Sequence, residues 1–154
     1  MKNAEEVSIG EKYYCGAHIG KLNYEEGKAA CQAMNGRLPL PRNKIESKDI
    51  MNFALKQGVK QTIHLGAENI ESSGKFEDWV DDNGEKLSFS NWNSQAKVVG
   101  SSAFMWVKPG YSQTEKWFIG KGNHAEVICL QEITGIFNFK AFNILLMIEI
   151  SLLI

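Results

Sequence analysis

The spacing of apolar residues changes along the chain, from helix-like in the first third to strand-like afterwards. Between residues 23 and 58, two segments repeat apolar residues every three or four positions, which indicates α-helices with one buried face. Beyond Gly58, short runs of alternating apolar and polar residues are separated by Gly, Asn and Ser, as in β-strands. The pattern therefore predicts an α+β fold, with two helices packed against an antiparallel sheet.

Both helices have clear start signals. Asn23 followed by Glu26 forms a capping box, and Asn43 followed by Glu46 forms another. Cys31 falls on the apolar face of the first helix and is expected to point inward.

The remaining elements are expected to be short strands joined by long loops. A turn is expected at 16–20, and a hairpin around the Asp82-Asn83-Gly84 turn. The expected strands are Lys12–Cys15, Thr62–Leu65, Ala103–Val107, Glu115–Ile119 and Ala125–Leu130, with the hairpin over Phe76–Phe89.

The composition is that of a soluble globular protein. The chain has 154 residues, 44% of them apolar and 23% charged, with a net charge of −1. This size fits one domain, and the balanced charge offers no positive surplus for a polyphosphate or an anionic membrane surface. We therefore expect no nucleic-acid partner and no membrane association.

The two ends differ from the middle. We expect an N-terminal extension at 1–10, one domain at 11–132 and an aliphatic C-terminal tail at 133–154. The extension lacks the apolar core of a signal peptide, so the chain is expected to be a mature or truncated form, or intracellular. Lys140 and Glu149 interrupt the tail, so its longest uncharged run is shorter than a transmembrane helix requires. We expect the tail to cover a core face or to be non-native.

The three cysteines fit no zinc pattern, and their odd number leaves one unpaired after a single bridge. No nucleophile, metalloprotease or phosphate-loop motif is present. Cys15 and His18 are near in sequence, which leaves a thiol-dependent enzyme using Cys15 as an alternative. We expect no enzymatic activity.

Several short motifs occur in a characteristic order. They are Lys12–Tyr14, Asn23–Cys31, Gly36–Leu40, Ile63–Ala67, Phe76–Trp79, Leu87–Trp92, Met105–Trp106 and Val127–Cys129. Together they resemble the C-type lectin-like domain, whose fold has two helices flanking antiparallel sheets and a long loop region. The resemblance implies a non-enzymatic, secreted recognition module for a carbohydrate or a protein.

The same resemblance assigns the cysteines. It pairs Cys31 with Cys129, while both halves of the family's second bridge are absent, with Ala103 at one of the two positions. Cys15 is then a free buried thiol or forms an intermolecular disulfide. His64 stands where the family has a buried Trp, and we expect it to be a partly buried core residue.

Sugar-binding members of the family hold Ca²⁺ through oxygen ligands around a cis-proline and after a Trp. Here the corresponding segments are Gln95-Ala96-Lys97 and Trp117-Phe118-Ile119, which lose the proline, an acid and both later oxygen ligands. The acidic cluster at 77–85 does not fit an EF-hand register and is expected to be a solvated turn. We therefore carry over no metal ligand and expect no Ca²⁺ at the primary sugar site.

The expected ligand-binding surface lies on the long-loop face. Amide and aromatic groups suit sugars, and the lysines suit an acidic glycan or a protein carboxylate. The candidate residues are Asn93, Gln95, Lys97, Lys116 and Trp117, with Tyr111 beside them. Two alternatives are open: a calcium-dependent lectin with atypical ligands, and a misprocessed chain whose tail prevents secretion. The identity of the ligand and the oligomeric state stay open.

Overall fold

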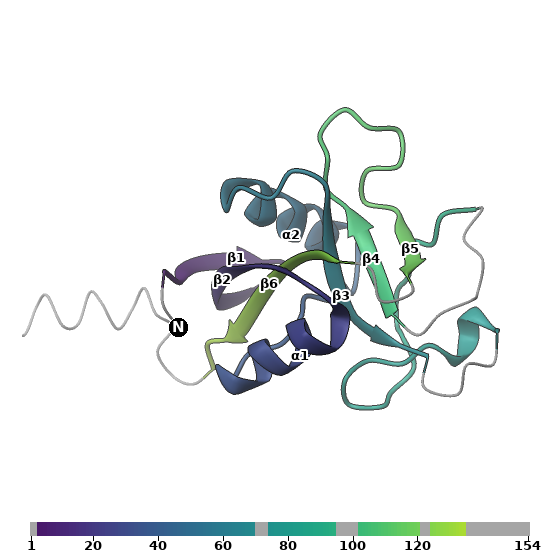
Figure 1. The fold of residues 1–154 in the computed structure, drawn as a ribbon, viewed down its shortest axis with the longest axis horizontal. Helices are drawn as coiled ribbons and strands as arrows, with labels where there is room; N and C mark the ends of the chain where they lie inside the picture. The colour runs from purple at the N-terminus through teal and green to yellow at the C-terminus, as the bar shows by residue number, and fades with distance from the viewer. Residues whose placement is uncertain (1–2, 70–73, 95–101, 121–123, 135–154) are drawn as a thin grey trace, which may run out of the picture.

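A six-stranded sheet organises the chain, as the computed structural model in Figure 1 shows. The structure describes residues 3–69, 74–94, 102–120 and 124–134. In chain order the elements are β1 (Glu5–Ile9), β2 (Lys12–Leu22), α1 (Tyr24–Ala33), α2 (Lys44–Lys56), β3 (Thr62–Glu68), the 3₁₀ turn η1 (Phe76–Asp78), β4 (Ser102–Trp106), β5 (Trp117–Gly120) and β6 (Ala125–Glu132). The predicted α+β fold is confirmed.

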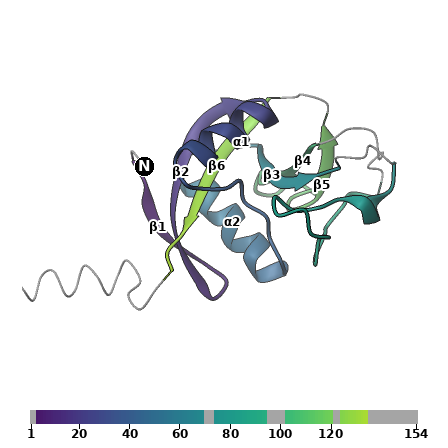
Figure 2. The same cartoon turned by 90° about the horizontal axis from the view of Figure 1, so that it is seen from below.

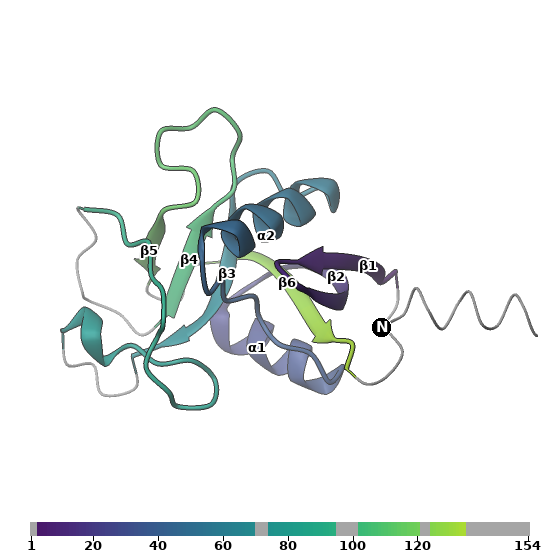
Figure 3. The same ribbon diagram turned by 180° about the vertical axis from the view of Figure 1, so that it is seen from behind.

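The strands lie in the order β1-β2-β6-β3-β4-β5. Neighbours are antiparallel except β3 and β6, which meet in parallel at Ile63 and Glu126. Figures 2 and 3 show α1 and α2 on opposite faces of this sheet. The strand order therefore places the two ends of the described chain beside β1 and β6, away from β4 and β5.

α1 is tied to β6. Asn23 accepts a hydrogen bond from the backbone N–H of Glu26, and Glu26 accepts one from the N–H of Asn23, so the predicted capping box is present. Cys31 forms a disulfide with Cys129 of β6, as the family resemblance implied. Gly27 lets the helix approach closely, because an added Cβ would lie 2.8 Å from a Val127 methyl.

α2 covers the other face of the sheet. The side chain of its N-cap, Asn43, accepts from the N–H of Glu46, as predicted, but the capping box is incomplete because the Glu46 carboxylate accepts from the N–H of Arg42. Phe53 packs so closely on β2 that a Cβ at Gly16 would lie 2.7 Å from its ring. Apolar residues of β3 and β6 complete this core, among them Leu65 and Ile128.

A second, aromatic part of the core lies beside β5. The ring centroids of Trp79 and Trp92 are 4.9 Å apart, and those of Trp92 and Trp117 are 5.4 Å apart. Phe89 meets Trp117 edge-on at 6.0 Å. Residues 91–93 run along β5, where the backbone N–H of Trp117 donates to Asn91 and that of Asn93 donates to Trp117. The aromatic packing thereby fixes the start of β5.

Three expectations differ from the structure. Residues Glu5–Ile9, expected in an extension, pair with β2 as an edge strand. The turn expected at 16–20 is a continuation of β2, with a bulge between His18 and Gly20. Within 76–89 a regular hairpin is replaced by η1 and isolated bridges of Val80 to Glu68 and Lys86. The tail beyond Thr134 lies outside the described residues.

Candidate functional site

The structure brings together three of the predicted ligand-binding residues, Asn93, Lys116 and Trp117. The side-chain amide of Asn93 donates to Gln113, and Nζ of Lys116 lies 3.1 Å from Oδ1 of Asn91. Both side chains are partly exposed. Gln95 and Lys97 lie outside the described residues, so their place beside this group stays a prediction.

Trp117 does not belong on a binding surface. Its side chain is 0% exposed and packs in the aromatic core, so it cannot stack on a ligand. The physical reason is strand alternation: Trp117 points inward in β5, and the outward position belongs to Phe118. The resemblance fixed the position of Trp117 in the chain without fixing the direction of its side chain.

An aromatic row lies on the outward side of β4, β5 and the loop between them; we define it as Phe104, Trp106, Phe118 and Tyr111. Phe104 and Phe118 stack at 5.7 Å between ring centroids. Trp106 meets Phe118 edge-on at 6.2 Å and Tyr111 at 5.0 Å. The row is continuous across both strands and includes three residues that sequence reasoning did not assign to a site.

The row is exposed because of the strand alternation. Ala103, Met105 and Val107 are 0% exposed, whereas Phe104 and Trp106 between them are partly exposed. Tyr111 is 39% exposed. Figure 1 shows α1 over β3 and β6, with β4 and β5 beside it. The alternation in 103–107 was available in the sequence and could have identified this face.

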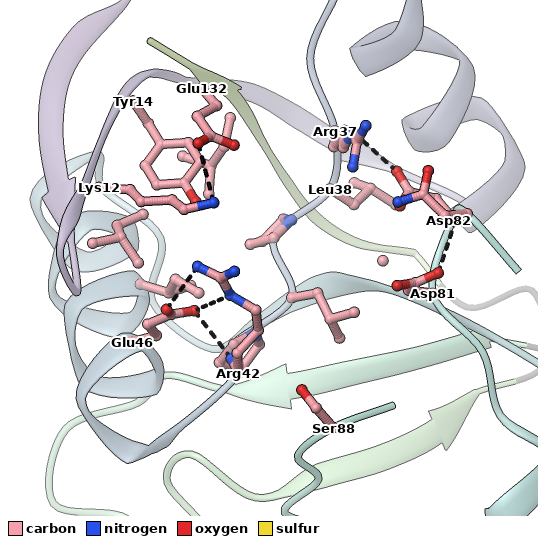
Figure 4. Close-up of a pocket in the computed structure, with 18 of the residues that line it drawn as sticks. Lys12, Tyr14, Arg37, Leu38, Arg42, Glu46, Asp81, Asp82, Ser88 and Glu132 are labelled. Atoms are coloured by element: carbon pink, nitrogen blue, oxygen red, sulfur yellow. Dashed lines mark hydrogen bonds and ion pairs between the residues drawn. The ribbon is translucent and has the colours of Figure 1, made fainter. Parts of the chain in front are cut away.

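A hollow of about 710 Å³ lies elsewhere, between the N-terminal hairpin, residues 37–42 and residues 81–89 (Figure 4). Its floor includes apolar residues, and charged side chains line its walls. Three ion pairs lie in this lining: Arg42 binds Glu46 at 3.1 Å, Lys12 binds Glu132 at 3.1 Å and Arg37 lies 3.4 Å from Asp82. We refer to this hollow as the charged groove.

A partly buried carboxylate connects α1 to β3. Glu68 accepts hydrogen bonds from the hydroxyl of Tyr24 and from Nζ of Lys28. Although burial opposes ionisation, these two donors hold the pKa of Glu68 below its ordinary value. Burial and the Glu68 hydrogen bond raise the pKa of Tyr24. Tyr24, Lys28 and Glu68 are hydrogen-bonded within this cluster, which indicates a structural role.

The acidic, histidine and cysteine side chains of the described residues are spread apart or paired with other groups. No group of three or more His, Cys, Asp or Glu side chains among them could hold a metal ion. The acidic turn is stabilised by its own hydrogen bonds, since Oδ1 of Asp81 accepts hydrogen bonds from the backbone N–H groups of Asn83 and Glu85. Cys15 and His18 point to opposite faces of β2, being three residues apart, and His18 pairs with Glu126 at 2.6 Å.

With the fold and these surfaces described, comparison with known proteins identifies the family. The model of the lectin C-type domain matches residues 20–129. The chain belongs to this family. It is therefore a non-enzymatic binding module, as the sequence motifs implied.

One relative supports the family assignment, and a solved structure shows the same fold. A tetranectin-like protein from Carcharhinus perezii is 30% identical over 112 residues, which cover 72% of this chain and 64% of that protein. Human lithostathine has the same fold, with a TM-score of 0.66 and 14% identity, covering 86% of this chain and 90% of its own.

A third similar structure is a Ca²⁺-independent C-type lectin, SPL-2, from Saxidomus purpuratus. It has a TM-score of 0.60 and 18% identity, covering 76% of this chain and 85% of its own. Like the lithostathine match, it shows the shared fold. Among the described residues, no helix is long and apolar enough to cross a membrane.

Proposed function

We propose that this lectin-type domain is a secreted recognition module that binds its ligand without Ca²⁺ at the position where sugar-binding members of the family hold one. The observation that carries the proposal is the replacement of the two oxygen ligands after Trp117 by Phe118 and Ile119 on β5. The segment Gln95-Ala96-Lys97 supports the same conclusion from sequence.

The number of available oxygen ligands decides whether Ca²⁺ binds at this position. Ca²⁺ takes six to eight oxygen ligands, several of them anionic in a site of useful affinity. Phe118 contributes a ring that stacks on Phe104, and Ile119 packs against the apolar core. An ammonium group at Lys97 would repel a divalent cation. Recognition must then rest on hydrogen bonds, stacking and charge supplied by side chains.

Calcium titration tests this proposal without a known ligand. We expect no heat of binding by calorimetry and no rise in melting temperature in millimolar Ca²⁺ relative to chelator. A site filled a hundredfold above its dissociation constant would add about 2.7 kcal/mol to the folded state, which a melting curve detects easily.

Millimolar Mg²⁺ serves as the matched control, because it reproduces the ionic strength and charge of Ca²⁺. A stabilisation produced by Ca²⁺ and absent with Mg²⁺ would show that the chain recruits calcium through atypical ligands, and the proposal would be wrong.

A further inference from the structure

We propose that the aromatic row and Lys108 form the contact surface for an acidic saccharide, a sugar carrying carboxylate or sulfate groups. This inference rests on the proposed function and names its ligand class and its surface. The row lies on the sheet face to which Phe118 points, and residues 91–93 run along the edge of β5.

The rings supply the stacking part of the site. Aromatic side chains pack well against the apolar C–H faces of sugar rings, and several adjacent rings contact more than one sugar unit. Ring contacts run without a gap from Phe104 through Phe118 and Trp106 to Tyr111. Their inward neighbours Met105 and Trp117 are fully buried, so the strands that carry the row are held rigidly.

The positive charge of Lys108 at the end of the row favours an acidic sugar. Nζ of Lys108 lies 5.9 Å from the ring centroid of Tyr111, so the row ends at a cation. Lys108 is exposed, and it makes no ion pair with another described residue. A carboxylate or sulfate on a stacked sugar would pair with this ammonium group.

Polar groups at the edge of the row suit the hydroxyls of the same ligand. Thr62 of β3 lies opposite Trp106 in the sheet register, and Tyr111 carries its own hydroxyl at the exposed end. His64 lies opposite Phe104 and is buried under α1, which bounds the surface on the β3 side. Glu115, in the same loop as Lys108, is the nearest carboxylate in sequence, and its backbone N–H donates to the carbonyl oxygen of Trp106.

The test is a nuclear magnetic resonance titration of the full chain with a chondroitin sulfate hexasaccharide, in chelator throughout. The neutral probe is maltohexaose. We expect the acidic probe to shift resonances of the aromatic row and of Lys108, and maltohexaose to bind at least about tenfold more weakly because it lacks the ion pair. Shifts centred on the charged groove, or no binding of the acidic probe, would overturn the inference.

Variants separate stacking from charge. Trp106→Leu and Tyr111→Ser are each expected to weaken binding about tenfold, and Lys108→Gln to weaken it several-fold and reduce its salt dependence. The controls lie on α2, on the opposite face of the sheet: Ile45→Ala, at a position 68% exposed, and Lys48→Gln. Losses equal to those of the controls would indicate non-specific attraction and contradict the assignment.

The same titration in Ca²⁺ keeps the two proposals distinct. Binding in chelator that is unaffected by the row variants overturns this inference and leaves calcium-independent recognition in place. Binding that requires Ca²⁺ overturns the proposed function, whichever residues shift.

Discussion

His64 is a titratable residue held inside the fold. It is 3% exposed, and Nε2 lies 2.7 Å from the carbonyl oxygen of Leu22, so the tautomer with a proton on Nε2 donates there. Burial lowers the pKa of His64, the Leu22 carbonyl opposes this and His124 adds to it. The prediction that His64 is a core residue was correct, and its side chain is more deeply buried than predicted.

This burial makes stability depend on pH. The unfolded chain binds a proton at His64 near pH 6.5, while the folded chain does so only at lower pH, so the free energy of unfolding falls as the pH drops below about 6.5. We expect His64→Gln to remove this component, which amounts to at most about 1.4 kcal/mol per pH unit.

Urea unfolding at pH 7.5, 6.5 and 5.5 measures the effect. His124→Gln is the comparison variant, because His124 is exposed and its charge is the smallest of the three influences on the pKa of His64. Parallel losses of stability in the wild type and in His64→Gln would contradict the account of a neutral, buried imidazole.

At the scale of elements, α1 depends on its capping box. Asn23→Ala removes the hydrogen bond that the side-chain oxygen accepts from the N–H of Glu26 at 2.9 Å. We expect a loss of about 1 kcal/mol in the free energy of unfolding, measured by chemical denaturation. The matched control is Asn52→Ala, an exposed position inside α2, where alanine should have little effect or stabilise slightly. Equal effects at both positions would argue against the cap.

The elements also show what sequence can predict. Both helix starts were correct, because an Asn followed by a Glu three residues later is a local signal. β1 was missed because Glu5–Ile9 has only two apolar residues, and its strand conformation depends on pairing with β2. The extended course of β2 through Gly16 depends equally on distant contacts, here with Phe53 of α2.

Of the two candidate surfaces, the aromatic row could be predicted from sequence and the charged groove could not. The resemblance pointed to β5, and simple alternation along 103–107 would have separated the exposed Phe104 and Trp106 from their buried neighbours. The charged groove could not be found from sequence, because its lining comes from β2, the segment after α1, the start of α2 and residues 81–89. Only the fold brings these segments together.

At the scale of the whole molecule, the Cys31–Cys129 disulfide joins residues 98 positions apart. Closing a loop of this length restricts the unfolded chain, and removing the bridge is expected to cost roughly 2–5 kcal/mol. We expect the double variant Cys31→Ala, Cys129→Ala to show this loss in thermal or urea unfolding. Cys15→Ala is the control, because Cys15 is a free, partly exposed thiol. A double variant as stable as the control would show that the bridge contributes nothing.

The central claim is that this C-type lectin domain recognises its ligand without calcium. The most direct measurement is a glycan array probed with the full chain twice, once in millimolar Ca²⁺ and once in chelator. We expect the same acidic glycans to be bound in both buffers, because Phe118 and Ile119 leave no oxygen pair for the ion. Binding that is present in Ca²⁺ and absent in chelator would contradict this account.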